Sequence, residues 1–412
     1  MGEKENVRSR YESTNRRKWS VLFISIAVMF ILGVYFVTIG VADTSITQVL
    51  RAISAWIGGR LNSGSSAENA SYKIIVLMRL PRIALAVIAG IGLSVSGIAM
   101  QAVTRNPLVS PFTMGISSAS AFGASMCIVF GTGALFKSEL GIILCAFAAA
   151  IMCIALVYSI SSKAGMGPET VVLTGIALNY FFSALTSTIE FFAQEHKLAA
   201  VVQWTFGTFN GTVWRDVLFS GVFVLICSVI IMASYLKLNV MAAGDDELVT
   251  SLGINPKRIR VVMCVASVFM TASVISFTGV IGFVGLVAPH ISRMLVGNDH
   301  KFLIPFSAVV GGMLLMISDA VGKTILSPVS IPVGIVVSFL GVPLFINLIL
   351  RRRRYVLFKE LVARIKVRSQ KRCVLRMLFR VRRTYRKNDT SIIRDPTVCF
   401  VKQPDGSFIL SF

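Results

Sequence analysis

Charged residues are scarce in this sequence. Only 15% of its 412 residues are Asp, Glu, Lys or Arg, whereas soluble globular domains carry about 25%. Hydrophobic residues make up 55% of the chain and recur in long apolar runs from end to end. A soluble protein would have to bury all of these runs. The composition therefore excludes an ordinary soluble domain and indicates an integral membrane protein.

Residue patterns for metal binding and covalent catalysis are missing as well. The seven cysteines show no CxxC spacing, and five lie in apolar runs, where a free cysteine behaves as a small hydrophobic residue. His290 has no Cys, Asp or Glu at ligand spacing, so we expect a structural histidine, no metal site and no disulfide. The apolar runs also lack HExxH, paired carboxylates and a Ser/His constellation. Their absence argues against an intramembrane enzyme.

One segment imitates the end of a nucleotide-binding loop. Gly322-Lys323-Thr324 fits the last part of G-x-x-x-x-G-K-[ST], but that pattern requires glycine where Ile317 stands. No strand pattern precedes the segment. We therefore predict a chain that is not an enzyme and does not hydrolyse ATP, and that takes this energy from a separate subunit.

Ten apolar runs predict an all-α polytopic membrane protein, because about 20 apolar residues can cross a bilayer as a helix. The first run is too long for a signal peptide and lacks a small-residue cleavage site, so we predict a retained anchor. The run at 83–103 is rich in Gly, Ser and Ala, which let helices pack closely in lipid. The runs occupy residues 19–40, 83–103, 111–130, 140–160, 170–193, 217–236, 261–283, 286–296, 303–321 and 332–350.

The net charge of +22 is unevenly placed. Residues 351–412 carry 18 Lys or Arg against 4 Asp or Glu, which is +14 of the total, so the basicity does not indicate a nucleic-acid partner. With ten spans, three basic regions lie on the same side of the membrane: residues 351–412, the residues before the first run, and the segment 237–260. The positive-inside rule makes that side, with both termini, cytoplasmic. Five basic residues oppose this orientation: Arg51, Arg60, Lys73, Arg79 and Arg82.

Five spaced stretches together resemble one transporter family. They are RLPR at 79–82 with the following RNPL at 105–108, WTFGTFNGTVW at 204–214, DDELVTSLGINPKRIR at 245–260, TGVIGFVGLVAPHISRMLVGNDH at 278–300 and SDAVGKTILSPVSIPVGIVVSFLGVPLF at 318–345. In order and spacing they are similar to the FecCD family of ABC-importer permeases, which move iron–siderophore complexes, haem and vitamin B12. The resemblance covers about residues 20–354.

The resemblance implies a permease bundle like that of the vitamin B12 importer, a type II ABC importer, in a prokaryotic plasma membrane. It implies four kinds of partner: a second permease copy or close homologue, two ABC ATPase subunits, an extracytoplasmic substrate-binding protein and membrane lipid. ATP and Mg would be bound by the ATPase, and we expect no cofactor on this chain. The carried compound would be an iron–siderophore-type metal chelate, with haem or a corrinoid as alternatives.

An ion-coupled secondary transporter is a further alternative. It would require several buried carboxylates along a path, and Glu190 and Asp319, near the ends of their runs, support it poorly.

The charged segment 237–260 is the predicted contact with the ATPase. Its acidic start suits a helix N-terminus, and Gly253 predicts a break between two short helices. In the resembling permeases this loop lies in a groove of the ATPase and transmits its closure; the alternative is a solvated loop. The resemblance assigns this coupling role to Asp246, Glu247, Leu248, Leu252, Gly253, Ile254 and Pro256.

Three basic residues are predicted to meet carboxylates of the binding protein, again by resemblance: Arg79, Arg82 and Lys323. Such exposed ion pairs set orientation and association rate more than affinity. The alternative is that the arginines reach the lipid headgroups. The chain has Ser330-Ile331-Pro332 where the family usually has Glu-Leu-Pro, and we expect Asp319 to cap the membrane boundary or to pair with Lys323.

Polar residues in two apolar runs are candidates for lining a path between two permease copies. They are Gln101, Thr174, Asn179, Ser183 and Ser187. The alternative is that these side chains form hydrogen bonds between helices.

The predicted organisation has three parts: a basic N-terminus at 1–18, a membrane domain at 19–354 and a basic tail at 355–412. Within the tail, 355–387 is compatible with a helix. Residues 397–411 predict a hairpin around a Pro-Asp-Gly turn. Attraction to anionic headgroups, regulation of the ATPase and a reading-frame artefact all remain open for the tail.

Overall fold

The computed structural model describes residues 2–40, 44–59, 71–133, 138–326, 329–343, 346, 399–402 and 408–411. The chain divides into two units, Met1–Phe345 and Ile346–Phe412. The predicted basic segment 355–387 lies outside the described residues. The domain limits at residues 18 and 354 remain predictions.

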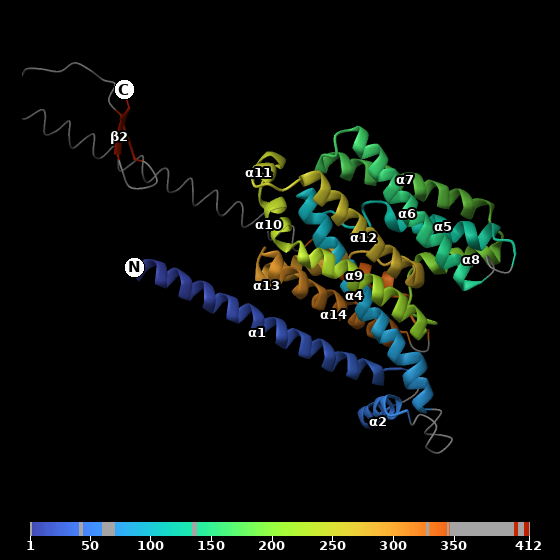
Figure 1. The fold of residues 1–412 in the computed structure, drawn as a ribbon. Helices are drawn as coiled ribbons and strands as arrows, with labels where there is room; N and C mark the ends of the chain where they lie inside the picture. Colours follow the sequence, from blue (N-terminus) through green and yellow to red (C-terminus); the bar gives the residue numbers. More distant parts are fainter. Residues whose placement is uncertain are drawn as a thin grey trace, which may run out of the picture. The chain divides into compact units, whose positions relative to one another are not determined.

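The first unit is helical throughout its described secondary structure (Figure 1). Its elements are α1 (Gly2–Thr38), α2 (Ile46–Ile57), the π-helix η1 (Ile75–Arg79), α4 (Leu80–Thr104), α5 (Ile116–Phe130), α6 (Glu139–Lys163), α7 (Pro168–Phe192), α8 (Glu195–Thr205), α9 (Trp214–Ala233), α10 (Tyr235–Ala243), α11 (Asp246–Ser251), α12 (Pro256–Thr278), α13 (Val284–Val296) and α14 (His300–Thr324). A further apolar helix spans Val333–Pro343.

The polytopic all-α prediction is confirmed. Seven described helices are long and apolar enough to cross a membrane: Asn15–Thr38, Ser71–Thr104, α6, α7, α9, α12 and α14. The other three predicted runs correspond to shorter apolar helices, α5, α13 and Val333–Pro343. Backbone turns precede two of these short helices. Residues 111–115 form turns before α5. Helix α12 ends at Thr278, and the next residue, Gly279, has a φ of 71°, so the chain turns before α13 begins at Val284.

Helix α4 lies at the centre of the first unit, between α9, α12 and α14 (Figure 1). In the span Ser71–Thr104, which contains α4, 78% of the most apolar 18-residue stretch is buried, compared with 11% in the span Asn15–Thr38 of α1. Glycine permits this packing. A Cβ on Gly90 would lie 2.2 Å from the carbonyl oxygen of Gly311 on α14, and one on Gly97 would lie 2.1 Å from that of Gly285 on α13. The prediction of a tightly packed span is confirmed.

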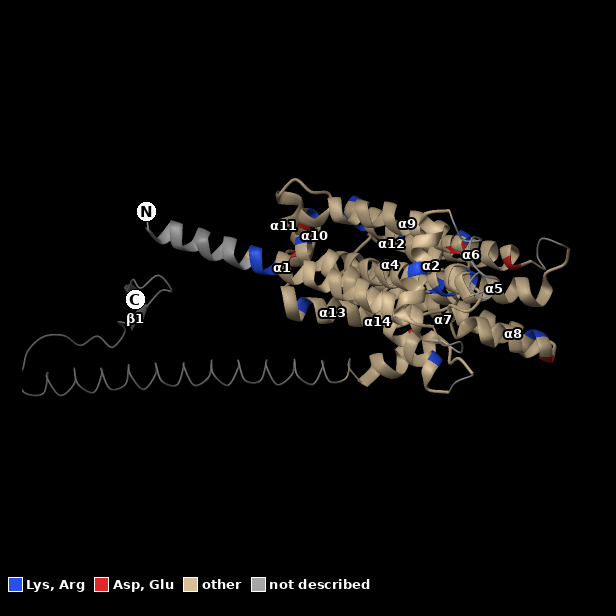
Figure 2. Cartoon of the chain, turned by 90° about the horizontal axis from the view of Figure 1, so that it is seen from below, with Lys and Arg blue, Asp and Glu red and all other residues tan. Residues whose placement is uncertain are grey.

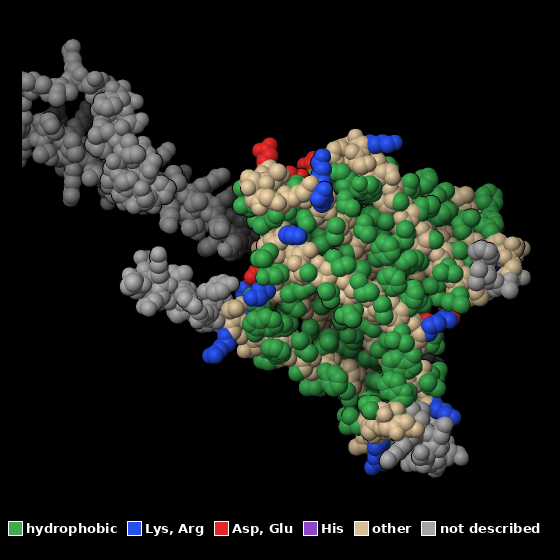
Figure 3. Space-filling view, in the orientation of Figure 1, with side chains coloured by type: hydrophobic (Ala, Val, Ile, Leu, Met, Phe, Trp, Pro, Cys, Tyr) green, Lys and Arg blue, Asp and Glu red, His purple; other side chains and the backbone are tan. Residues whose placement is uncertain are grey.

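Most of the visible surface of the bundle is apolar (Figure 3). Large exposed side chains include Tyr180 and Phe191 on α7 and Leu218 and Leu225 on α9. Lys, Arg, Asp and Glu gather toward the ends of the helices (Figure 2). An apolar belt between charged ends is what a hydrocarbon environment selects. Helices α10 and α11 lie at one end, called here the α11 end, and α2 and α8 lie toward the opposite end, called the α8 end.

The second unit contains a two-stranded antiparallel hairpin of β1 (Cys399–Lys402) and β2 (Phe408–Ser411). Cys399 pairs with Ser411 and Lys402 with Phe408. This pairing confirms the two predicted strands, whereas the predicted Pro-Asp-Gly turn between them lies outside the described residues.

Candidate functional sites

The predicted coupling segment forms α10, α11 and the start of α12. Asp245 precedes α11, and Gly253 turns the chain with a φ of 77°. Pro256 is the first residue of α12, and the side chain of Asn255 accepts a hydrogen bond from the backbone N–H of Arg258. The expectation of two short helices is therefore wrong in its second half. Past the glycine turn, helix-starting residues begin a long span that continues to Thr278.

The tip of this segment presents apolar side chains outward. Leu248 is 52% exposed and Leu252 is 59% exposed, whereas Val249 between them is fully buried. Glu247 and Gly253 are exposed, Ile254 is half-buried and Pro256 is buried. No neighbour lies within 4 Å of a Cβ built on Gly253. The tip thus exposes two leucines and a carboxylate, while the buried Val249 packs into the hydrophobic core of the bundle.

Asp246 holds α11 against two other segments. Its carboxylate lies 2.6 Å from the guanidinium of Arg105, just after α4, and 3.1 Å from that of Arg260 on α12. Burial by itself would raise the pKa of the Asp246 carboxyl, but hydrogen bonds from Arg260 and Arg105, together with their positive charges, bring the pKa below its usual value. The carboxylate is therefore ionised at neutral pH and forms part of a three-charge cluster.

The basic residues predicted to meet a binding protein are turned inward. Arg79 donates hydrogen bonds to the carbonyl oxygens of Val37 and Thr38 and to Oγ1 of Thr44, so it fastens the end of α1. Arg82 forms a two-pronged ion pair with Asp319, with its Nη2 2.7 Å from Oδ1.

Lys323 lies 2.7 Å from Oδ2 of the same carboxylate, which confirms the expected Asp319–Lys323 pair. Arg82 also donates to the side-chain oxygen of Asn210. The Asp319 side chain is fully buried, and those of Arg82 and Lys323 are 15% exposed. This ion-pair cluster, Arg82–Asp319–Lys323, joins α4 to α14 near the end opposite α11.

Four of the five path candidates lie on α7, and three of these four line one cavity. Asn179, Ser183 and Ser187 line a cavity of about 300 Å³, which Ser117 and Ser118 of α5 also line. Gln101 and Thr174 do not line this cavity.

Gln101 is buried and donates to the carbonyl oxygen of Gly285 3.1 Å away, so it forms the interhelical hydrogen bond considered as the alternative. Thr174 is buried nearer the start of α7.

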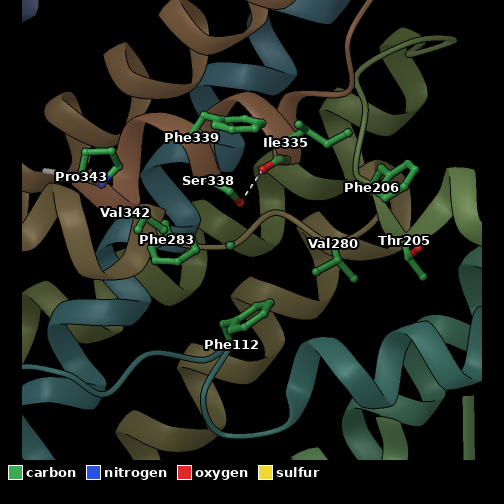
Figure 4. A pocket seen from close by; sticks show the side chains of 12 residues that line it. Phe112, Thr205, Phe206, Val280, Phe283, Ile335, Ser338, Phe339, Val342 and Pro343 are labelled. Carbon is green, nitrogen blue, oxygen red and sulfur yellow. Dashed lines mark hydrogen bonds between the residues drawn. The ribbon is translucent and has the colours of Figure 1, made fainter. Parts of the chain in front are cut away.

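Figure 4 shows the lining of an apolar cavity of about 560 Å³, which adjoins the polar cavity. The two share Phe112, Thr205 and Val280 as lining residues. Phe283 and Phe339 form other parts of the apolar wall. The sequence signals missed this cavity, because its walls come from residues 112, 205–206, 280–283 and 334–343, far apart along the chain.

In the part of the chain that the structure describes, no three His, Cys, Asp or Glu side chains converge as metal ligands would.

Comparisons with known proteins agree with this arrangement. The sequence profile of the FecCD transport family matches residues 25–351. The chain belongs to this family. It is a multi-pass membrane protein of the ABC-permease type, and ABC permeases work with an ATPase and a substrate-binding protein.

Several FecCD relatives are permeases of iron import systems. The Fe(3+)-citrate import system permease protein YfmD of Bacillus subtilis is 33% identical over 341 residues, which cover 82% of this chain and 97% of that protein. The iron(3+)-hydroxamate import system permease protein FhuB of the same organism is 33% identical over 365 residues, 86% of this chain and 90% of that one.

A solved structure shares the fold. A metal-chelate type ABC transporter in an inward-facing conformation matches with a TM-score of 0.70 and 31% sequence identity. The match covers 81% of this chain and 99% of that chain.

Proposed function

We propose that this FecCD-family chain is the permease subunit of an importer that moves an iron–siderophore-type metal chelate across a prokaryotic plasma membrane. The citrate and hydroxamate relatives support an iron chelate as the cargo. The observation that best supports the transport role is the exposure of Leu248 and Leu252 on the predicted coupling segment 237–260. Exposed leucines on a charged, non-membrane segment suit a protein partner rather than water.

In this proposal, ATP and Mg bind to a separate ATPase and no cofactor binds to this chain. The segment matching part of a nucleotide loop, Gly322-Lys323-Thr324, lies at the end of helix α14. Lys323 there pairs with Asp319, so its ammonium is already engaged by a carboxylate. A phosphate-binding loop instead needs backbone N–H groups at a helix N-terminus.

Transport itself is non-covalent. Two permease copies would face each other across the adjoining polar and apolar cavities, which the shared residues Phe112, Thr205 and Val280 connect. A cavity with one hydroxyl-rich wall and one aromatic wall suits a chelate that has polar donors around an organic shell. ATP-driven closure of the ATPases would move α11 and rock the two copies between outward-open and inward-open states.

The α11 end is cytoplasmic in this proposal, as are both termini, and the opposite end receives the binding protein. Arg79, Arg82 and Lys323 would contribute positive potential there. The ion-pair cluster contains two cations and the single carboxylate of Asp319, so its net charge is +1. This excess favours approach by an acidic partner.

The cargo has a second candidate class. The molybdate import system permease protein MolB of Haemophilus influenzae is 35% identical over 286 residues. A relative about as similar to this chain as the iron permeases is thus named for a cargo other than an iron chelate. Haem and a corrinoid also stay candidates. Uptake assays with each labelled compound in the reconstituted complex would separate these classes.

The first test is ATP hydrolysis by the permease–ATPase complex in lipid, with and without binding protein. We expect stimulation in the wild type and its loss in Gly253→Pro, because proline fixes φ near −65° and residue 253 has a φ of 77°. Gly133→Pro is the matched control. Gly133 also has a positive φ, 90°, with open space around its Cβ position, and it follows the end of α5, where Lys197 of α8 donates to the carbonyl oxygen of Val129.

Two results would refute the proposal. One is a permease that never co-purifies with an ATPase, and the other is uptake that proceeds without one. Either would favour an ion-coupled secondary transporter.

A further inference from the structure

Arg260 joins three segments that are distant in the sequence. Its Nη1 donates to the carbonyl oxygen of Met166, 2.6 Å away in the α6–α7 connection. Its Nε donates to the carbonyl oxygen of Val103 near the end of α4, and its Nη2 to the carboxylate of Asp246 on α11. The Arg260 side chain has no exposed surface. A fully buried guanidinium with these partners fixes the relative positions of all three segments.

The surrounding backbone is shaped for these contacts. Met166 has a φ of 57°, an uncommon value for a residue other than glycine. Arg105 has a φ of 53° and ends α4. Arg105 also donates to the carbonyl oxygen of Met241 on α10, in addition to its ion pair with Asp246. Met166 and Arg105 therefore have uncommon backbone conformations close to the two carbonyl groups that accept from Arg260. Such conformations persist only where the surrounding structure enforces them.

We propose that Arg260 is the positioning residue through which movement of α11 reaches α7, the helix that lines the polar cavity. Met166 immediately precedes the Gly167–Pro168 start of α7. Asn179, Ser183 and Ser187 lie further along this same helix. This role rests on the proposed transport function. It makes Arg260 the connection between α11, which contacts the ATPase in that proposal, and α7, which lines the polar cavity.

Burial supplies the physical reason for the linkage. If Asp246 moved away alone, the guanidinium of Arg260 would stay buried without its counter-charge, which is strongly unfavourable. Arg260 therefore has to follow Asp246, and the carbonyl groups of Val103 and Met166 follow Arg260. Lysine cannot replace it, because an ammonium on a flexible stem does not reproduce the fixed fork of guanidinium donors.

The test uses the complete complex of permease, ATPase and binding protein in proteoliposomes. Arg260→Lys is compared with Arg17→Lys, the same substitution at an exposed position on α1, outside the segment 237–260. Both uptake and ATP hydrolysis are measured. We expect Arg260→Lys to keep ATP hydrolysis that the binding protein stimulates, while uptake per ATP falls about fivefold or more. Arg17→Lys should match the wild type.

A second measurement separates coupling from a general structural effect. Leu248→Cys on α11 and Ser187→Cys on α7 place thiols at exposed positions. Their reaction with a water-soluble reagent is followed with and without nucleotide, after subtraction of the background from the native cysteines. In the wild type, nucleotide should change both rates. In Arg260→Lys, it should still change the rate at residue 248 but no longer that at residue 187.

Wild-type uptake per ATP in Arg260→Lys, or a nucleotide response at residue 187 that persists in it, would overturn the inference. If Arg260→Lys does not fold, Asp246→Asn replaces it, because it removes the counter-charge and leaves Arg260 in place, and the same outcomes apply. Failure of the proposed function looks different. The wild type and Arg17→Lys would then also show no ATP-dependent uptake.

Discussion

Replacing the buried carboxylate of the ion-pair cluster should strongly destabilise the bundle. In Asp319→Asn, the cations of Arg82 and Lys323 lose the carboxylate that lies 2.7 Å from each of them. Removing one partner of a buried ion pair costs about 3–5 kcal/mol. The two cations are 15% exposed and can turn partly toward water, so we expect about 3 kcal/mol, the low end of that range.

The free energy of unfolding can be measured by denaturant titration in mixed micelles. Glu139→Gln is the matched control, because it also neutralises one acid of an ion pair. Glu139 is 75% exposed, and one of its oxygens lies 3.9 Å from Arg215, whose side chain is 51% exposed. Exposed pairs of this kind contribute less than about 1 kcal/mol, so the control should lose much less stability than Asp319→Asn.

A double variant tests the reasoning further. Asp319→Asn combined with Lys323→Met removes one of the two unpaired cations and should recover part of the lost stability. Two outcomes would refute the argument: an Asp319→Asn loss no larger than that of Glu139→Gln, or further destabilisation on adding Lys323→Met. In either case the buried charges would not act as a unit.

Two other substitutions test the packing and the electrostatics. Gly97→Val should cost about 2–3 kcal/mol, because its Cβ would lie 2.1 Å from the carbonyl oxygen of Gly285. Gly221→Ala, whose Cβ would lie 3.4 Å from Ile88, should cost little in the same unfolding assay; equal losses would contradict the close packing of α4. Asp246→Asn should lower stability at neutral pH. The pKa of this carboxyl is lowered from 3.8 in the folded chain, so its contribution is complete above about pH 4 and is lost as pH falls through the lowered pKa. The difference between wild type and variant should therefore shrink in acid, and a constant difference would show that the charge is not responsible.

Some features followed from the residues near one another in the sequence. Apolar runs of about 20 residues predict membrane-spanning helices, because apolar side chains are stable in lipid and a helix pairs its own backbone N–H and C=O groups. The Gly- and Ser-rich run at 83–103 indicated a packed helix, and α4 is the central one. The Asp319–Lys323 pair was expected because the two residues are one helical turn apart. Family motifs added the identity of the chain, which the sequence profile confirms.

Other features needed the tertiary structure. Arg82 is 237 residues from Asp319, and Arg260 is 94 residues from Met166. No periodicity connects such positions, because their contact depends on which helices pack side by side and on how each is rotated. The same reason explains why Arg82 and Lys323, predicted to face a partner, turn inward toward Asp319. It also explains why Gln101 and Ser187, alike as polar residues in apolar runs, lie in a helix contact and a cavity wall, respectively. The sequence by itself determined which segments lie in the membrane, since that depends on local hydrophobicity. Only the tertiary structure decided which charges pair and which polar groups face a cavity, since burial and distance arise from packing.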